Sequence, residues 1–300
     1  MHSAASEAGS ERGGGVTHEQ RQVWLVTNQS SGSNDAASTD SLRAAFAEAG
    51  WEVARTLCFP DEDIPAAADL RAAGDPVVAI YTGDGTVNSF VTALEGWGGQ
   101  ILVLPGGTQN LLSKRMHGDA SADEIVARIG RGALRAVRIT AIRCAGGQAL
   151  VDLLVGPGPS WNNVREALRE GNIVAAVGQT GEAVSATTSG SGVRCIEPAL
   201  GPPAGYPLMK LMPTHRGIQV DGYYANKLSE FLQQGWALLR RDFRAGPHDR
   251  LGLVDRLVMA KDDGSAVDIL LDGEPAQVGA RAEFTLAECA VDLLATDHGF

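Results

Sequence analysis

The first 130 residues alternate short apolar runs with longer stretches in which apolar positions recur at a helical period. Apolar runs of strand length lie at residues 23–27, 51–56, 76–81 and 101–104, and helical patterns lie at about 39–49, 65–73, 86–97, 109–116 and 122–129. Strands that alternate with helices are typical of a parallel sheet with crossover helices. The almost continuously apolar run at 76–81 indicates a central strand buried on both faces. We therefore expect an α/β domain with a doubly wound parallel sheet.

The pattern changes near residue 133. Residues 134–144 and 148–155 alternate apolar and polar positions as half-buried strands do, and the Ala-Gly-Gly at 145–147 between them is a hairpin signal. Strand patterns predominate in the rest of the chain, which indicates a second, strand-rich α+β domain of β-sandwich type. Residues 1–20 are polar and rich in glycine, so they bury too little surface to order themselves. The expected organisation is a disordered tail over 1–20, an α/β domain over 21–132 and a β-rich domain over 133–295.

Composition narrows the classes of function. The chain has 36 acidic and 25 basic side chains and a net charge of -11, which argues against binding to a nucleic-acid backbone. Its apolar runs are much shorter than the roughly 18 residues of a membrane-spanning helix. The four cysteines are widely spaced and form no C-x-x-C pair, so we expect neither a zinc site nor a disulfide framework. A reducing cytoplasm fits this cysteine usage best.

A polar, glycine-rich loop follows the predicted central strand. It reads Thr-Gly-Asp-Gly-Thr-Val-Asn over residues 82–88 and leads into a predicted helix. Gly83 and Gly85 permit tight backbone geometry, and the N-terminus of the helix is suited to a phosphate group. Asp84 could act through Mg²⁺ or water. The alternative is an ordinary turn in which Asp84 or Thr86 only caps the helix.

Two further polar loops follow predicted strands of the same sheet. Residues 104–110 read Leu-Pro-Gly-Gly-Thr-Gln-Asn, and residues 28–32 read Asn-Gln-Ser-Ser-Gly. Ligands of parallel sheets bind where the carboxyl ends of the strands meet, so we expect all three loops to lie at one edge.

A pair of carboxylates lies much later in the chain, in the Asp-Gly-Glu sequence at 272–274. Two carboxylates on one turn can face the same cleft, where one accepts a proton and the other orients it or holds a metal. By itself this sequence is more typical of a solvated hairpin turn.

Taken together, these motifs resemble the diacylglycerol kinase catalytic family, which includes bacterial lipid kinases and is related to sphingosine and ceramide kinases. The family patterns Asn-Pro-x-Ser-Gly, Gly-Gly-Asp-Gly-Thr, Gly-Thr-x-Asn and Asp-Gly-Glu correspond to residues 28–32, 82–86, 107–110 and 272–274. This sequence differs at Thr82, Ser89 and Leu111, where the family usually has Gly, Glu and Asp.

The resemblance implies an ATP- and Mg²⁺-dependent lipid kinase whose active site lies in the cleft between an ATP-binding and a lipid-binding domain. The implied nucleotide contacts are Asn28, Ser31, Gly32, Thr56, Gly83, Asp84, Gly85, Thr86, Val87, Asn88 and Thr108. The implied catalytic residues are Glu274, Asp272 and Asp84, and residues alone do not decide whether Asp272 or Glu274 accepts the proton. The segment 218–223 resembles a structural Mg²⁺ site in which Asp221 is the side-chain ligand and flanking backbone oxygens, at Ile218 and Tyr223, are further ligands. A plain turn at 221–222 is the alternative.

Two other functions stay open. A kinase of NAD shares a similar glycine-rich loop, and a non-catalytic module could bind a lipid or a nucleotide without turnover. A lipid kinase without a spanning segment needs peripheral membrane contact, so we expect a cytoplasmic protein that docks through local basic clusters. The candidates are Lys114 with Arg115, and Arg240 and Arg241 with Arg244. We expect no nucleic-acid partner, and a homodimer stays open.

Overall fold

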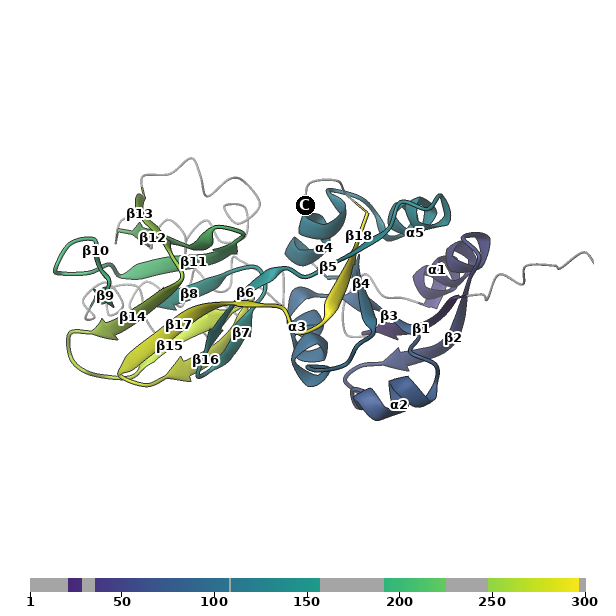
Figure 1. Ribbon diagram of the computed structural model, residues 1–300, viewed down its shortest axis with the longest axis horizontal. Coiled ribbons are helices and arrows are strands. Elements are labelled where there is room, and N and C mark those ends of the chain that lie inside the picture. The colour runs from purple at the N-terminus through teal and green to yellow at the C-terminus, as the bar shows by residue number, and fades with distance from the viewer. Residues whose placement is uncertain (1–20, 29–35, 108, 157–191, 225–247, 297–300) are drawn as a thin grey trace, which may run out of the picture.

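The computed structural model describes residues 21–28, 36–107, 109–156, 192–224 and 248–296 (Figure 1). Within these ranges the chain forms three six-stranded sheets and five helices. No helix in the described ranges is long and apolar enough to cross a membrane.

The first sheet has the strand order β2-β1-β3-β4-β18-β5. Its strands are β1 Arg21–Thr27, β2 Trp51–Cys58, β3 Val77–Thr82, β4 Gln100–Pro105, β5 Arg135–Val137 and β18 Asp292–Ala295. Pairing is parallel from β2 through to β18, and β5 runs antiparallel to β18. Parallel pairing aligns the carboxyl ends of β1, β3 and β4 at one edge, where the predicted loops begin.

Helices cover both faces of this sheet. The helices are α1 Ala36–Glu48, α2 Ala67–Ala72, α3 Asp84–Ala93, α4 Leu111–His117 and α5 Ala122–Gly130. Alternate residues of β1 point to opposite faces: Trp24 and Val26 join a core with α2, α3 and α4, whereas Val23 and Leu25 join a core with α1 and α5. Burial on both faces explains why the strands are almost entirely apolar.

The other two sheets share one apolar core. Their orders are β10-β9-β14-β17-β6-β7 and β13-β12-β11-β8-β15-β16. The strands are β6 Thr140–Cys144, β7 Gly147–Ala149, β8 Leu153–Gly156, β9 Val193–Glu197, β10 Ala199–Leu200, β11 Leu208–Thr214, β12 Gly217–Tyr223, β13 Asp249–Val254, β14 Arg256–Lys261, β15 Val267–Leu271, β16 Glu274–Val278 and β17 Arg281–Glu288. Side chains such as Ile142 and Phe284 from one sheet and Leu211 and Ile269 from the other are fully buried in this core.

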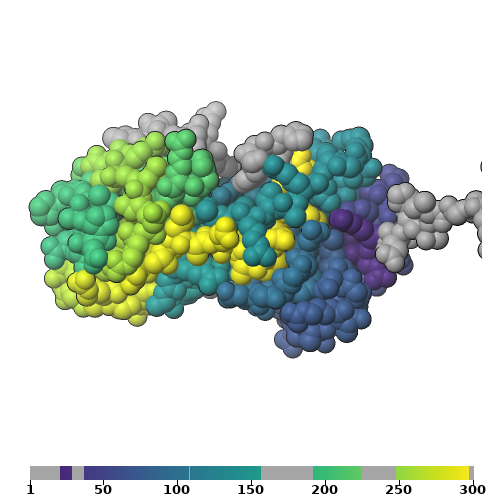
Figure 2. Space-filling model, viewed as in Figure 1, coloured from purple at the N-terminus to yellow at the C-terminus, as the bar shows by residue number. Residues whose placement is uncertain are grey.

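The C-terminal part of the chain connects the two halves of the molecule. Strand β17 lies in the second half, and β18 then enters the first sheet beside β4 (Figure 1). The yellow C-terminal residues run across the surface between the halves (Figure 2). Strands β5 and β18 therefore pair within the first sheet, although the expected boundary after residue 132 placed both with the β-rich part. The predicted strand-rich α/β fold is confirmed.

Candidate active site

The two glycine-rich loops touch each other at the carboxyl edge of the first sheet. The register pairs Thr82 at the end of β3 with Pro105 at the end of β4, and the Gly106 N–H donates to the Thr82 carbonyl oxygen at 3.3 Å. A Cβ atom on Gly107 would lie 2.4 Å from the Cα atom of Gly83. The backbones approach so closely that only glycine fits at position 107.

The second loop is held by its own asparagine. Asn110 has a positive φ of 52°, a conformation that asparagine tolerates better than most residues. Its side chain accepts a hydrogen bond from the Gly107 N–H and donates one to the Gly107 carbonyl, both at 2.8 Å. Thr108, an expected nucleotide contact in this loop, lies outside the described residues.

Asp84 connects the first loop to helix α4. Its carboxylate accepts hydrogen bonds from the N–H groups of Leu111 at 2.9 Å and Leu112 at 3.0 Å, which are the first two residues of α4. Burial raises the pKa of Asp84, and these two hydrogen bonds oppose the rise because they favour the charged form. The aspartate therefore holds α4 in place, a structural task that the sequence motif does not show.

Helix α3 presents its N-terminus at the same edge. Gly83 is the N-cap, and glycine has no side chain that could bind the first N–H groups of the helix. The N–H groups of the first turn, which includes Asp84, Gly85 and Thr86, form the positive end of the helix dipole and suit an anion. Val87 differs, because its side chain is fully buried and its N–H donates to the Gly83 carbonyl.

The side chain of Asn88, one turn further along α3, reaches the other half of the molecule. Its Nδ2 atom donates to the carbonyl of Gln148 at 2.8 Å and to Oδ2 of Asp272 at 2.9 Å. Asn88 was expected to contact the nucleotide. In the structure its side chain links α3 to the turn that joins β15 to β16.

Asp272 is surrounded by hydrogen-bond donors. Besides Asn88, the N–H groups of Leu150, Val151 and Asp152 donate to its carboxylate at 2.7, 2.9 and 3.0 Å. Its own N–H donates to the Asp152 carbonyl, and its backbone has a positive φ of 46°. Burial raises the pKa of Asp272 to about 7, while the three backbone donors oppose the rise and the nearby Asp152 carboxylate adds to it.

Glu274 lies on the same turn but has different surroundings. It is the exposed first residue of β16, and a Cβ atom on Gly85 would lie 2.8 Å from its Oε1 atom. Its side chain therefore packs directly against the N-terminal turn of α3. On this turn, the Asp272 carboxylate is therefore bound by hydrogen-bond donors, and the Glu274 carboxylate lies beside the glycine-rich loop.

Arg115 of α4 also reaches the second half of the molecule. Its Nη1 atom lies 2.9 Å from the Leu150 carbonyl oxygen, and Nη2 makes a longer contact of 3.5 Å with the Thr140 hydroxyl. The neighbouring Lys114 is 48% exposed and pairs with Asp119. Of the expected basic pair, Arg115 therefore links the two halves of the molecule, whereas Lys114 lies at the surface. The cluster at Arg240, Arg241 and Arg244 lies outside the described residues.

The remaining expected nucleotide contacts follow or lie on the first two strands. Asn28 directly follows β1 and is half-buried, and Ser31 and Gly32 lie outside the described residues. Thr56 lies two residues before the end of β2, and its hydroxyl accepts a hydrogen bond from Arg43 of α1 at 2.6 Å.

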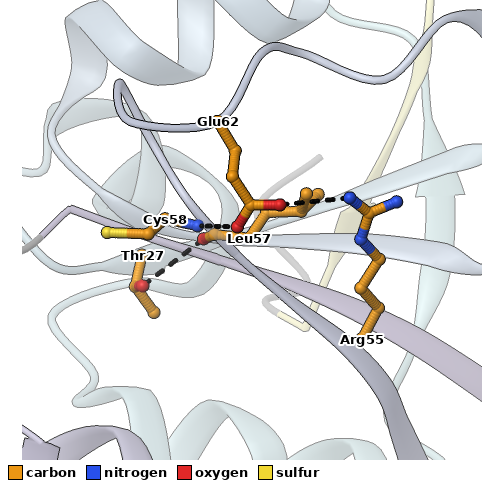
Figure 3. Close-up of polar contacts among 5 residues, drawn as sticks. All are labelled: Thr27, Arg55, Leu57, Cys58 and Glu62. Atoms are coloured by element: carbon orange, nitrogen blue, oxygen red, sulfur yellow. Dashed lines mark hydrogen bonds and ion pairs between the residues drawn. The ribbon is translucent and has the colours of Figure 1, made fainter.

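Glu62, which no sequence motif indicates, holds the end of β2. Its carboxylate accepts from the Cys58 N–H at 3.0 Å and pairs with Arg55 at 3.1 Å (Figure 3). The Thr27 hydroxyl donates to the Leu57 carbonyl at 3.4 Å and connects the ends of β1 and β2. These contacts hold the ends of β1 and β2 in a defined position.

The structural Mg²⁺ site implied for Asp221, Ile218 and Tyr223 does not fit the geometry. All three lie on the extended strand β12, and at about 3.3 Å per residue the five steps from Ile218 to Tyr223 separate them by roughly 16 Å. Two ligands of one Mg²⁺ ion lie within about 4 Å of each other.

The carboxylate of Asp221 is buried, and one of its oxygens accepts from the Gln219 amide at 2.9 Å. The other makes no hydrogen bond and lies 3.8 Å from Nε of Arg250. A cationic side chain therefore neighbours this oxygen. In the described ranges no three His, Cys, Asp or Glu side chains come close enough to hold a metal ion.

A known protein family matches the part of the chain that carries the glycine-rich loops. Residues 22–142 match the family model of the diacylglycerol kinase catalytic domain. The resemblance to the diacylglycerol kinase family is confirmed. The matched segment contains both glycine-rich loops, Asn88 and Arg115, whereas the Asp-Gly-Glu turn of the diacylglycerol kinase pattern lies beyond it. None of the curated proteins matches the chain.

Solved structures with a similar fold span almost the whole chain. A crystal structure named "a putative diacylglycerol kinase from Bacillus anthracis str. Sterne" has a TM-score of 0.60 and 14% identity, and covers 92% of this chain and 97% of its own. A structure of a diacylglycerol kinase from the same organism has a TM-score of 0.58 and 12% identity, with the same coverage of both chains. At such low identity the likeness shows the fold alone.

Proposed function

We propose that this protein is an ATP- and Mg²⁺-dependent lipid kinase that transfers the γ-phosphoryl group of ATP to a lipid hydroxyl. The observation that carries the proposal is the contact between Glu274 and Gly85, which puts a carboxylate beside the N-terminus of α3. A phosphate bound to that N-terminus would lie next to a proton acceptor. The match of residues 22–142 to the diacylglycerol kinase catalytic domain supports the same reaction class.

The nucleotide is proposed to bind along the carboxyl edge of the first sheet, in the cleft between the two halves of the molecule. Backbone N–H groups of Gly83, Gly85 and Thr86 would stabilise its phosphates. The Mg²⁺ ion that accompanies ATP would neutralise charge on the transferring group, with Asp84 acting near it through water. Asn28, Ser31, Gly32, Thr56 and Thr108 remain proposed contacts for the rest of the nucleotide.

Glu274 is proposed as the proton acceptor and Asp272 as the residue that holds the turn. The oxygens of Asp272 already accept four N–H hydrogen bonds, which leaves little room for a substrate proton. In the step, the lipid hydroxyl oxygen bonds to the γ-phosphorus and its proton passes to the Glu274 carboxylate. The bond from the γ-phosphorus to the bridging oxygen breaks, and ADP leaves.

The experiment is a panel assay with labelled ATP, Mg²⁺ and lipid alcohols in mixed vesicles, with mass identification of the product. We expect one lipid class to be phosphorylated, and Glu274→Gln to reduce the turnover number by about a hundredfold or more with the KM for ATP nearly unchanged. Near-normal turnover by Glu274→Gln would contradict its role. Phosphorylation of NAD instead of a lipid would contradict the proposed substrate class, and nucleotide binding without any product would indicate a non-catalytic module.

A further inference from the structure

Arg115 and Asp272 bind opposite ends of the same residue. The Leu150 N–H donates to Oδ2 of Asp272 at 2.7 Å, and the Leu150 carbonyl accepts from Nη1 of Arg115 at 2.9 Å. Leu150, the first residue after β7, is therefore held from both sides. The two binding side chains come from distant parts of the chain, one from α4 and the other from the turn before β16.

Helix α4 carries this connection back to the glycine-rich loops. Its first two N–H groups donate to Asp84, and Arg115 follows on the next turn of the same helix. The half-buried Arg115 keeps its charge because a guanidinium group is not deprotonated in proteins. Burial lowers the pKa of Arg115, and the neighbouring Asp272 carboxylate opposes that change. The permanent cation therefore lies near the carboxylate that organises the turn.

We propose that Arg115 is a positioning residue for the proton acceptor. By holding the Leu150 carbonyl, it keeps the N–H groups of residues 150–152 directed at Asp272. The fixed Asp272 in turn keeps Glu274 against Gly85, two residues further along the turn. The expected effect of Arg115 on turnover rests on the proposed function. Its expected effect on the order of the turn does not depend on any activity.

The test compares Arg115→Gln with a matched control on the neighbouring, exposed residue, Lys114→Gln. Both changes remove one positive charge from α4, so a general charge effect would appear in both. Hydrogen exchange of the amides of Leu150, Val151 and Asp152 reports the order of the turn without a substrate. We expect these amides to exchange at least about tenfold faster in Arg115→Gln and at the wild-type rate in Lys114→Gln.

Kinetics then separates positioning from a merely structural effect. We expect Arg115→Gln to lower the turnover number by about tenfold or more while the KM for ATP changes little. Arg115→Lys keeps the charge without the planar pair of donors, so it should recover only part of the loss. If Arg115→Gln does not fold, Arg115→Lys provides the same two measurements.

The outcomes are distinct. Unchanged exchange at residues 150–152 in a folded Arg115 variant would overturn the proposal, as would faster exchange with wild-type turnover. If the wild-type protein phosphorylates no lipid, the proposed function is wrong. In that case, wild-type exchange at residues 150–152 in the Arg115 variants would overturn the inference that Arg115 orders the turn. Faster exchange would support the ordering of the turn by Arg115 but no role in turnover.

Discussion

The side-chain amide of Asn88 lies 2.9 Å from the carboxylate of Asp272, although 184 residues separate them in the sequence. The same amide donates to the Gln148 carbonyl, so one side chain of α3 binds two segments of the β-rich half. Helix α3 begins at the glycine-rich loop, and Asp272 lies two residues before Glu274. The amide of Asn88 therefore helps to fix the position of Glu274 relative to the glycine-rich loop.

Asn88→Asp should destabilise the protein. The substitution removes both hydrogen bonds and places a second carboxylate against Asp272, so we expect the free energy of unfolding to fall by about 3 kcal/mol. Urea denaturation measures this loss. Ser89→Asp is the matched control, because Ser89 is an exposed neighbour on the same helix and should tolerate the charge. Equal stability of the two variants would mean that the link to Asp272 contributes little.

Gly85→Ala should impair turnover without loss of stability. The new methyl group would meet Oε1 of Glu274 at 2.8 Å, and this flexible side chain can move away at low energetic cost. Alanine is also favoured over glycine within a helix by about 1 kcal/mol. We expect a wild-type or higher melting temperature together with a lower turnover number. A Cβ atom on Gly83 would meet the Gly107 Cα atom at 3.8 Å and, among the described residues, no other atom within 4 Å. Gly83→Ala therefore leaves Glu274 in place and should affect ATP binding rather than the acceptor.

The free energy of unfolding should depend on pH through the titration of Asp272. Its pKa is about 7 when folded, whereas an aspartate in an unfolded chain has a pKa of about 3.9. The folded state therefore keeps a proton that the unfolded state loses, and the contribution of this group to the free energy of unfolding falls as the pH rises from about 4 to about 7. The charged neighbours Asp152 and Arg115 do not change this sign.

Asp272→Asn removes the titrating group and provides the reference. The unfolding free energy of the wild type minus that of the variant should decrease between about pH 4 and pH 7 and be constant above that range. A difference that increases with pH over this window would show that the N–H donors outweigh burial and that the folded pKa is lowered.

Removal of Mg²⁺ should leave the nucleotide-free protein equally stable. Asp221 has Arg250 beside it, and the extended β12 cannot bring Ile218 and Tyr223 to the same ion. We expect the same melting temperature in EDTA and in millimolar Mg²⁺. A rise with Mg²⁺ that disappears in Asp221→Asn would restore the implied structural metal site.

Several features of the fold follow from local sequence. The alternation of apolar runs and helical patterns predicted the strands β1 to β4 and the helices after them, because burial on both faces requires apolar residues throughout each strand. The strands β5 and β18 could not be assigned to their sheet in this way. The residues of β5 lie within the predicted strand pattern at 134–144, whereas β18 was not predicted as a separate strand. For both strands the choice of a pairing partner depends on contacts with segments far away in the chain.

For the site, the sequence by itself determined which residue types occur at the ends of the strands. Close backbone contact explains Gly107, and the asparagine at 110 suits a positive φ. Only the tertiary structure decided how the charged residues differ. Lys114 and Arg115 are adjacent and chemically similar, yet a helix directs neighbouring side chains about 100° apart, so one meets solvent and the other meets Leu150. Asp272 and Glu274 differ for the same kind of reason, since burial and hydrogen-bond donors come from segments that are distant in sequence.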